Sequence, residues 1–290
     1  MTRVVCLGDL LVDVHAALPG PLVFGSDTPA HIELRHGGGA ANVAAWLATL
    51  GAAATFVGRV GDDVLGRDAV TRLRDTGVRT QIDVDPDRPT GTCIVLVGSD
   101  GERTMIPSAG ANDAPPDLAL LPADTDWLYV SGYPLLRDSS RGPIARAIGQ
   151  ARDRGRAVAV DAASAGPLTA FGAQRFLDSI GGGVTLFANV DEARVLVGDL
   201  EPAAAAQALA TRCGSAVVKR GHAGAVWSDA SGVRSVPAVP ADAVDSTGAG
   251  DAFAAGFLAG GPTVADRLQL AADAAARAVS ALGGRPPHGV

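Results

Sequence analysis

The strongest constraint on the fold is a regular alternation of short apolar stretches with amphipathic ones in the second half of the chain. Expected strands at 127–130, 158–160, 185–187 and 216–218 alternate with expected helices at 139–154, 171–180 and 202–211. Strands and helices that alternate in this way form a mostly parallel sheet with helices on both faces. The alternation therefore predicts a doubly wound α/β fold, which two alanine-rich helices at 249–258 and 264–282 complete.

The first half of the chain extends this sheet and also interrupts it. Further strands are expected at 4–7 and 54–57, and helices at 40–50 and 63–76. The segments 92–97 and 103–106 flank Ser99-Asp100-Gly101, whose Asp-Gly pair is typical of a hairpin turn. We predict one domain over 1–290, in which segments of about 13–36 and 90–107 meet in a small β lid. An edge extension of the main sheet is the alternative.

Composition and charge exclude several classes of protein. The chain is 47% hydrophobic and 19% charged, as in a soluble globular protein, and its net charge of -7 argues against nucleic-acid binding. It has no apolar run of roughly 18 residues that would span a membrane. Asp9 and Asp13 make the N-terminus too polar for a signal peptide. Cys6, Cys93 and Cys213 lie far apart and form no metal motif, which favours a reducing cytoplasm.

The most informative motif is the stretch from Asp245 to Phe253, which reads DSTGAGDAF. It follows a strand-like stretch and opens an apolar helix. Small residues allow the backbone to approach a ligand closely, and the amides at a helix N-terminus favour an anion. We therefore expect the amides of Gly248, Ala249 and Gly250 to form an anion hole.

Asp251, in the first turn of that helix, has two interpretations. It could be a capping carboxylate that only stabilises the helix. It could also be a general base that takes a proton from an attacking hydroxyl while the amides stabilise a transferring phosphoryl group. The residue by itself leaves both open, but the Gly-Ala-Gly sequence before it favours an anion, because capping alone does not need three small residues.

Two other phosphate-binding motifs are excluded. A Walker loop needs Gly-Lys-Ser/Thr, whereas the only lysine of the chain, Lys219, lies between Val218 and Arg220. The second glycine run, GGGAAN from Gly37 to Asn42, lacks the last glycine of a dinucleotide-binding fingerprint. The chain is therefore neither an obvious P-loop enzyme nor a dehydrogenase.

The two glycine-rich stretches, in this order, resemble the ribokinase/PfkB family of carbohydrate kinases. DSTGAGDAF is similar to the second signature of that family, and the stretch from 37 to 66, with GGGAANVAAWLATLG followed by VGRVGDDVLG, is similar to the first. The resemblance spans nearly the whole chain. It implies a ribokinase-like fold and transfer of the γ-phosphoryl group of ATP, with Mg²⁺, to a hydroxyl of a sugar or sugar derivative.

The resemblance also implies roles for individual residues. Asp251 matches the catalytic base, and the anion hole is matched by Gly248, Ala249 and Gly250. The substrate-binding positions are matched by Asp13, Gly38 and Asn42. The NxxE motif associated with magnesium and phosphate is matched by Asn189 and Glu192, and the nucleotide-binding strand and turn by Lys219, Gly221 and Gly224. Asp245 matches a position that binds a monovalent cation such as K⁺ in some members.

Without the resemblance, several of these residues have simpler interpretations. Asp13 could cap a loop, Asn42 could cap a helix, and Glu192 could be an ordinary first-turn acid. Arg103, beside the predicted hairpin, is a candidate contact to substrate or phosphate, and a solvated side chain is the alternative.

Two departures from the family pattern bear on the substrate. Gly39 stands where ribokinases proper typically carry a lysine, which weakens an assignment to ribose. Lys219 stands where many relatives have a small hydroxyl residue, so it could reach the phosphates or face solvent. A nucleoside is the second acceptor considered, but the lid segments offer only Phe24 as an aromatic platform for a base.

Two further alternatives concern activity and assembly. A sugar-binding or regulatory protein without catalysis remains possible on the sequence, although an intact Asp251 argues against it. Exposed strand edges in the predicted lid favour a homodimer.

Overall fold

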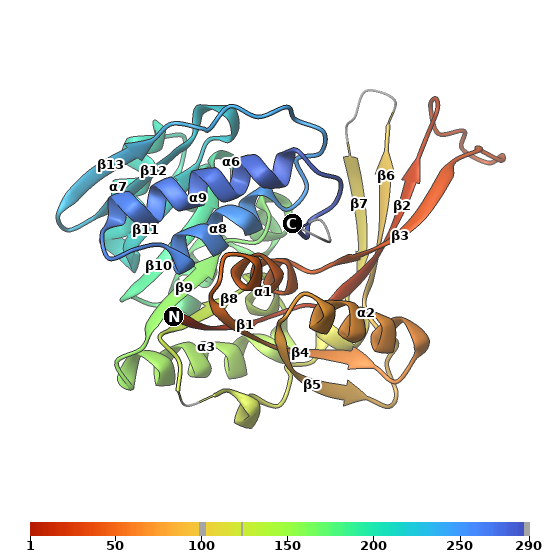
Figure 1. Cartoon of the computed structure of the whole chain (residues 1–290), viewed down its shortest axis with the longest axis horizontal. Helices are drawn as coiled ribbons and strands as arrows, with labels where there is room; N and C mark the ends of the chain where they lie inside the picture. The colour runs from red at the N-terminus through yellow and green to blue at the C-terminus, as the bar shows by residue number, and fades with distance from the viewer. Residues whose placement is uncertain (99–102, 123, 287–290) are drawn as a thin grey trace.

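A nine-stranded sheet forms the centre of the computed structural model, which describes residues 1–98, 103–122 and 124–286 (Figure 1). The strand order is β13-β12-β11-β10-β9-β8-β1-β4-β5. All neighbours from β11 to β5 are parallel, whereas β12 and β13 pair antiparallel at one edge. The strands are β1 (Arg3–Leu7), β4 (Ala53–Gly61), β5 (Arg79–Asp85), β8 (Trp127–Val130), β9 (Ala157–Asp161), β10 (Val184–Asn189), β11 (Gly214–Lys219), β12 (Ala225–Asp229) and β13 (Gly232–Val236). This sheet confirms the predicted doubly wound α/β class.

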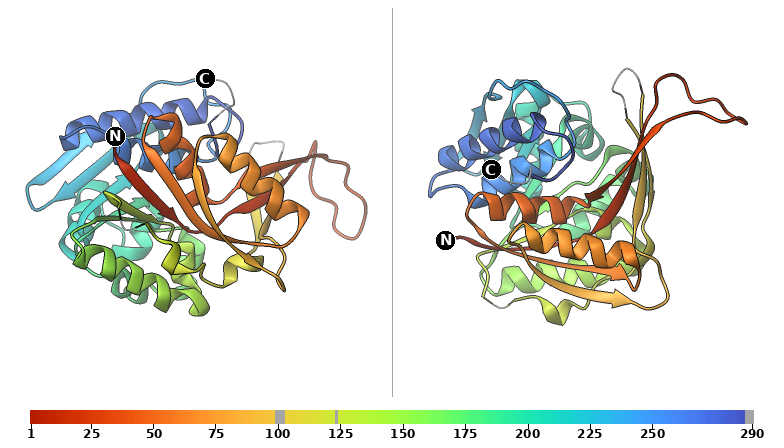
Figure 2. Two further views of the ribbon diagram at one scale, coloured as in Figure 1. Left: turned by 60° about the horizontal axis from the view of Figure 1, so that its bottom comes forward. Right: turned by 45° about the vertical axis from the view of Figure 1, so that its right-hand side comes forward.

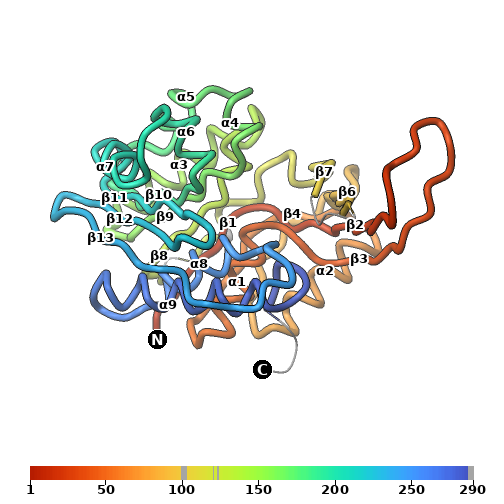
Figure 3. Tube along the Cα trace, turned by 90° about the horizontal axis from the view of Figure 1, so that it is seen from above, coloured from red at the N-terminus to blue at the C-terminus, as the bar shows by residue number. Residues whose placement is uncertain are grey.

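Helices cover both faces of the sheet, as Figure 3 shows from above. One face carries α1 (Gly39–Thr49), α2 (Val64–Asp75), α8 (Ala249–Ala259) and α9 (Val264–Val279), and the other carries α3 (Asp138–Asp153), α4 (Ala165–Phe171), α5 (Ala173–Ile180), α6 (Val190–Val197) and α7 (Pro202–Cys213). Alternate residues of a strand point to opposite faces. Accordingly, Val4 and Cys6 of β1 pack into one buried cluster, and Val5 and Leu7 pack into the other.

Local sequence signals explain where several helices begin. The side chain of Asp63 accepts a hydrogen bond from the Gly66 amide at 2.7 Å and so caps α2. Thr263 and Asp266 form a capping box at the start of α9. Pro202 occupies the first turn of α7, where its missing amide proton is not needed.

A separate small sheet projects from this body (Figure 2), with strand order β3-β2-β6-β7. Its strands are β2 (Leu11–Ala17), β3 (His31–Gly37), β6 (Thr92–Val97) and β7 (Arg103–Ser108). The two segments predicted to meet do meet, because β2 pairs parallel with β6. The strands of the predicted hairpin pair antiparallel, and its expected turn at Ser99-Asp100-Gly101 lies outside the described residues. A role of this sheet as a lid remains a prediction.

The structure corrects three expectations. The helix expected at 171–180 begins at Ala173, after Gly172 at φ 100°, and a helix that was not expected, α4, precedes it. The last helix ends at Val279 rather than at 282. No strand directly precedes Asp245: β13 ends at Val236, and the described residues from 237 to 244 form a loop. Short 3₁₀ turns occur at Gly110–Asp113, Leu118–Leu120, Tyr133–Leu136 and Gly221–Ala223.

Within the described part of the chain, none of the helices combines the length and the apolar character needed to cross a bilayer. All three cysteines are free thiols with buried side chains.

Candidate active site

The candidate active site lies at the carboxyl ends of the parallel strands. Strands β9, β10 and β11 end at Asp161, Asn189 and Lys219, and these strands neighbour each other in the sheet. The first helix, α1, packs against α8 beside this edge (Figure 1). Ligands of open α/β sheets bind at this edge, so the topology itself gathers the polar residues of the site.

The N-terminus of α8, where the anion hole is predicted, begins at a glycine that packs closely against the C-terminal segment. Gly248 precedes the helix at φ 73°, and a methyl group placed on it would lie 2.4 Å from the Cα atom of Gly284. Both the conformation and the space therefore require glycine at this position. No described side chain caps α8. The Ala249 amide donates to the Ser246 carbonyl at 3.3 Å, so of the three expected anion-hole amides this one is already engaged.

Asp251 lies in the first turn of α8 and faces α1. Its Oδ2 atom accepts a hydrogen bond from Nδ2 of the buried Asn42 at 2.9 Å. A methyl group on Gly39 would lie 3.4 Å from Oδ1, so the glycine run keeps space beside that oxygen. Burial raises the pKa of Asp251 to about 7, with Asp161 contributing and the Asn42 hydrogen bond opposing. The side chain does not cap its own helix, and its geometry and pKa suit a general base.

Lys219 lies next to the anion hole, inside a group of buried charges. Its Nζ atom is 3.0 Å from Oδ2 of Asp161, and a methyl group on Gly250 would lie 3.1 Å from Nζ. Burial by itself lowers the pKa of Lys219, but the charges of Asp161 and Glu192 outweigh it and the pKa is raised. The lysine is therefore a permanent cation directed at the amides of α8 rather than at solvent.

Asp161 was not identified from the sequence. No motif marks it, and the only available signal was its place at the end of an expected strand on the functional edge of the sheet. Its Oδ1 atom accepts a hydrogen bond from the Ala163 amide at 3.0 Å, so both carboxylate oxygens have partners. Asp161 is thus the counter-ion that fixes Lys219.

Asn189 and Glu192 form a capping box at the start of α6. The Asn189 side chain accepts from the Glu192 amide at 2.8 Å, and both Glu192 carboxylate oxygens accept hydrogen bonds from Asn189 at 2.8 Å. Burial raises the pKa of Glu192 to about 7, and the charge of Asp161 adds to this effect. The direct contacts of Asn189 and Glu192 are therefore those of a helix cap. The pair also lies at the carboxyl ends of the parallel strands, because Asn189 ends β10.

Three predicted substrate residues surround the N-terminus of α1. Asp13 on β2 is buried beside Gly37, where a methyl group would lie 2.2 Å from Oδ2 of Asp13. Burial raises the pKa of Asp13 to about 6, and the nearby Arg285 lowers it in part. Gly38 precedes α1 at φ 98°, and Asn42 follows within the first turns of the helix.

The C-terminal segment closes this side of the site and was missed at the sequence level. The indole Nε1 of Trp46 donates to the Gly284 carbonyl at 3.0 Å, and Nη2 of Arg285 donates to the Gly37 carbonyl at 3.4 Å. A methyl group on Gly284 would lie 2.6 Å from Nδ2 of Asn42. The end of the chain carries no recognisable motif, so only its contacts reveal its place.

Asp245 lies in a network that ties the small sheet to the loop before α8. Its oxygens accept hydrogen bonds from the Thr247 amide at 2.9 Å, the Thr247 hydroxyl at 2.7 Å and the Gly283 amide at 2.9 Å. The guanidinium of Arg103, on β7, contacts Asp245, Ser246 and Thr247. Burial tends to raise the pKa of Asp245, but these hydrogen bonds and Arg103 hold it at about 2.

The network around Asp245 gives Arg103 partners within the protein. Its side chain is 24% exposed and contacts Asp245. A cavity of about 550 Å³ adjoins this network between the inner face of the small sheet and the loop, and its lining includes His15, Arg35, Arg103 and Ser246.

Gly221 and Gly224 lie in the turn that joins β11 to β12. Their φ values are 57° and 84°, and a methyl group on Gly224 would lie 2.1 Å from the Val236 carbonyl oxygen. The turn therefore needs glycine for its own geometry. It follows Lys219 directly, at the same edge of the sheet.

The sequence profile of the pfkB family carbohydrate kinases matches residues 1–288. The chain belongs to this family. It is 32% identical over 272 residues to a 2-dehydro-3-deoxygluconokinase of Thermoproteus tenax, an alignment that covers 89% of this chain and 82% of the relative. It is 33% identical over 269 residues to a fructokinase of Klebsiella pneumoniae, covering 88% and 82%. The crystal structure of an adenosine kinase from Sinorhizobium meliloti superposes with a TM-score of 0.87 at 28% identity, covering 98% and 96%.

As a member of the pfkB family, the chain is a kinase of the sugar or nucleoside type, a phosphotransferase that uses an alcohol group as acceptor. Family membership implies ATP as the donor, and Mg²⁺ is usual in the family. In the described part of the chain, no group of three or more acidic, histidine or cysteine side chains could hold a metal by itself. Such a site fits Mg²⁺ that is bound mainly by phosphate oxygens and water, as is common in phosphoryl transfer.

A monovalent cation fits less well. The carboxylate of Asp245 already contacts the Arg103 guanidinium and accepts hydrogen bonds from Thr247 and Gly283. A cation bound to these oxygens would have to displace a positively charged side chain. We therefore assign K⁺ no step in the reaction of this pfkB kinase.

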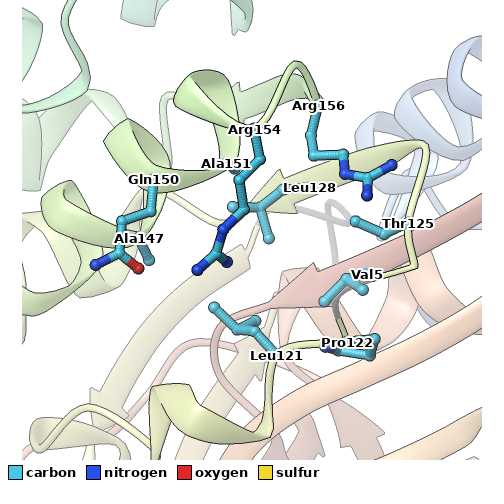
Figure 4. A pocket seen from close by; sticks show the side chains of 10 residues that line it. All are labelled: Val5, Leu121, Pro122, Thr125, Leu128, Ala147, Gln150, Ala151, Arg154 and Arg156. Carbon is cyan, nitrogen blue, oxygen red and sulfur yellow. The ribbon is translucent and has the colours of Figure 1, made fainter.

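A second, much smaller cavity of about 30 Å³ lies away from this edge (Figure 4). It is lined by Val5, Leu121, Pro122, Thr125, Leu128, Ala147, Gln150, Ala151, Arg154 and Arg156. Its volume corresponds to about one water molecule, so it cannot hold a sugar.

Proposed function

We propose that this kinase transfers the γ-phosphoryl group of ATP to a sugar hydroxyl, with Asp251 as the general base. The observation that carries the proposal is the environment of the Asp251 carboxylate and the raised pKa that results from it. It is held by one hydrogen bond from Asn42, its pKa is raised to about 7, and Lys219 and the Gly250 backbone lie beside it. A carboxylate with a pKa near neutral pH is suited to accept a proton during the reaction.

In the proposed reaction, the acceptor hydroxyl lies against the open Oδ1 side of Asp251. The hydroxyl oxygen attacks the γ-phosphorus atom, its proton passes to Asp251, and the bond from the γ-phosphorus to the bridging oxygen of ADP breaks. Lys219 and the free amides of α8 stabilise the negative charge on the transferring group. Bound Mg²⁺ would supply further neutralisation of the phosphates, with Asn189 and Glu192 placed to act on it only indirectly, through water.

Asp13, Gly38 and Asn42 are proposed to hold the acceptor, with the small sheet as a lid over it. Asp13 is buried at the base of that sheet, and Asn42 already contacts the proposed base. Arg103 then acts as a tie between lid and loop.

On the nucleotide side, we propose that Lys219 contacts the phosphates and that the turn with Gly221 and Gly224 lies near the adenine. The turn follows β11 and has exposed residues at its centre. The two glycines allow the backbone of this turn to approach a flat ring closely.

A sugar is favoured over a nucleoside. Relatives of the chain are named for both kinds of acceptor. The base of a nucleoside would need an aromatic platform. Phe24, in the loop between β2 and β3, is 90% exposed, so its ring does not pack in a pocket where it could serve as one. A nucleoside remains the second candidate acceptor.

We further propose that two copies of the chain pair through the outer face of the small sheet. Leu34, Ile94 and Ile106 lie in one register across this face and are 61%, 45% and 51% exposed. Exposed apolar patches of this kind mark interaction surfaces. Light scattering at micromolar concentration should give a dimer mass that Leu34→Glu halves, and a monomer mass for the wild type would refute the pairing. A cytoplasmic location, favoured by three free buried thiols, is likewise a proposal.

The activity is tested by ADP release from Mg-ATP across a panel of sugars, sugar acids and nucleosides, with Asp251→Asn as the control. Acceptor-dependent release that the variant loses would support the proposal and identify the acceptor class. Silence across the panel, together with calorimetric binding of sugar but no turnover, would favour the sugar-binding protein without catalysis.

A further inference from the structure

Arg285 is a cation of the site for which the described residues provide no ion-pair partner. Its Nε atom is buried without a hydrogen-bond partner, and its guanidinium makes one long hydrogen bond, from Nη2 to the Gly37 carbonyl at 3.4 Å. In the described part of the chain no carboxylate oxygen forms an ion pair with it within 4.0 Å. Burial lowers the pKa of Arg285 to about 10, and Asp13 offsets this only in part.

The other arginines near the small sheet differ in this respect. Arg59 lies 3.0 Å from Asp85, Arg137 lies 3.0 Å from Asp9, and Arg103 contacts Asp245. A buried charge is costly unless it is paired. Arg285 is therefore the exception among these arginines and calls for a different explanation.

The surroundings of Arg285 place it on the acceptor side of the site. Its hydrogen-bond partner Gly37 abuts the carboxylate of Asp13, and its neighbour Gly284 abuts the amide of Asn42, which binds Asp251. Among the described residues, Arg285 also lies close enough to His36 for its charge to lower the pKa of that ring, which pairs with Asp68 at 2.8 Å. Arg285 thus lies beside the proposed sugar ligand Asp13, and the residue before it, Gly284, lies beside Asn42, which binds the proposed base.

The position of Arg285 is fixed by its backbone. The Gly284 carbonyl accepts a hydrogen bond from Trp46 at 3.0 Å, and the Gly283 amide donates to Asp245 at 2.9 Å. Pro286, on the other side, is buried. These contacts fix the backbone on both sides of Arg285 before any ligand arrives, and such preorganisation of the segment reduces the entropy lost on binding.

We infer that Arg285 selects an acceptor that carries an anionic group, a carboxylate or a phosphate, in addition to the hydroxyls held by Asp13. The planar guanidinium presents paired donors that match both groups. The acid group would lie at Arg285 and supply the missing counter-charge, with the reacting hydroxyl at Asp251. This inference rests on the proposed kinase function and narrows its substrate class.

The test compares acceptors of equal carbon skeleton that differ in charge: neutral aldoses, the corresponding aldonic acids, and the corresponding sugar phosphates. We expect the wild type to prefer one charged set in kcat/KM, and which set it prefers identifies the anionic group. Arg285→Gln should lower the ratio of kcat/KM for the charged acceptor to kcat/KM for the neutral one about 10–100-fold, because a hydrogen-bonded charge pair contributes roughly 1.5–3 kcal/mol. The loss should appear mainly in KM for the acceptor.

Two further variants keep the result interpretable. Arg285→Lys retains the charge without the planar fork and should recover part of the ratio. Arg146→Gln removes an exposed arginine of α3, on the opposite face of the sheet, and should leave the ratio at the wild-type value. Thermal unfolding of each variant verifies that it is folded.

Failure of the inference differs from failure of the proposed function. If the wild type phosphorylates neutral acceptors as well as charged ones, and Arg285→Gln keeps the same ratio, the inference is wrong and the kinase function stands. If no acceptor is phosphorylated, the proposed function fails. Calorimetric binding of the same compounds to wild type and Arg285→Gln then still decides the inference: tighter binding of the anions that the variant loses supports it, and equal binding overturns it.

Discussion

Two aspartates of one short motif, Asp245 and Asp251, are placed in opposite electrostatic situations. Burial acts on both carboxylates and tends to raise both pKa values. Asp245 accepts hydrogen bonds from Gly283 and Thr247 and contacts Arg103, and its pKa falls to about 2. Asp251 accepts one hydrogen bond, from Asn42, and its pKa rises to about 7.

The comparison shows that a buried carboxylate keeps a raised pKa when it has few hydrogen-bond donors, whereas several donors and a nearby cation reverse the effect of burial. Asp245 has donors on both oxygens, so it holds the loop and the small sheet together and has little tendency to take a proton. Asp251 has an oxygen left free beside Gly39, so it can accept one. The proposed base is therefore the aspartate that the fold leaves incompletely satisfied.

The largest expected difference between the two aspartates is in turnover when each is replaced by asparagine. Asp251→Asn is expected to lower kcat about 10²–10⁴-fold, because the acceptor hydroxyl loses its base. Steady-state ADP release with the best acceptor measures this. Asp245→Asn is the matched control and should lower kcat far less; equal losses in the two variants would contradict the division of roles.

Substitution of Lys219 tests the proposed contact of this lysine with the phosphates. Lys219→Met should lower kcat roughly 10²–10³-fold, since removal of one preorganised donor from a transition-state site has effects of this size. Asp161→Asn removes the counter-ion that positions Lys219 but leaves the charge of the lysine, so it should lower kcat less than Lys219→Met does. Single-turnover rates at saturating ATP would show it, and a Lys219→Met enzyme with wild-type turnover would place the lysine outside the reaction.

For the free energy of unfolding, Asp245→Asn should have a larger effect than Asp251→Asn, the reverse of their order in kcat. Asp245→Asn removes the charge opposite Arg103 and weakens the contacts of the loop, and is expected to lower the free energy of unfolding by about 1–3 kcal/mol. Urea unfolding followed by circular dichroism measures the change. Asp251→Asn should not be destabilising in the same experiment, and a larger loss for it than for Asp245→Asn would reverse the comparison.

The pH dependence of stability follows from the sign of the Asp251 shift. Its folded pKa of about 7 lies above the unfolded value of 3.8, so ionisation of the folded protein costs stability as pH rises from about 4 to 7. Asp251→Asn abolishes this cost. The thermal midpoint of the variant should exceed that of the wild type by more at pH 8 than at pH 5, whereas a constant difference would indicate an ordinary pKa.

The smallest expected effect concerns monovalent cations. Because Arg103 already occupies the carboxylate of Asp245, exchange of K⁺ for tetramethylammonium should leave turnover unchanged within error. A strong dependence on K⁺ would show that the cation competes successfully with the guanidinium.

The sequence predicted the parts of the molecule that local chemistry determines. Periodicity placed the parallel strands, and the small residues around Gly248 marked the N-terminus of a helix. Helix α4 was missed, because a short segment that contains Gly166 and Pro167 gives little helical signal. Residues recognised through the family pattern, such as Asn42, do lie beside Asp251.

Residues whose roles depend on tertiary contacts could not be predicted. Asp161 is one acid among many until β9 and β11 bring it to Lys219. Arg285 lies in a segment without any motif and gains its position only because Trp46 and Asp245 hold the chain end. The contact of Arg103 with Asp245, far away in the sequence, could not be predicted either, and a contact of Arg103 with substrate stays a prediction.

The most direct test of the central claim is the pH dependence of kcat at saturating Mg-ATP and acceptor. We predict that kcat of the wild type rises with an apparent pKa near 7 and then levels off, as a base with the pKa of Asp251 requires. Asp245→Asn should show the same midpoint, and the residual activity of Asp251→Asn should lack it. A wild-type profile that stays flat from about pH 5 to pH 8 would contradict the assignment of Asp251 as the general base.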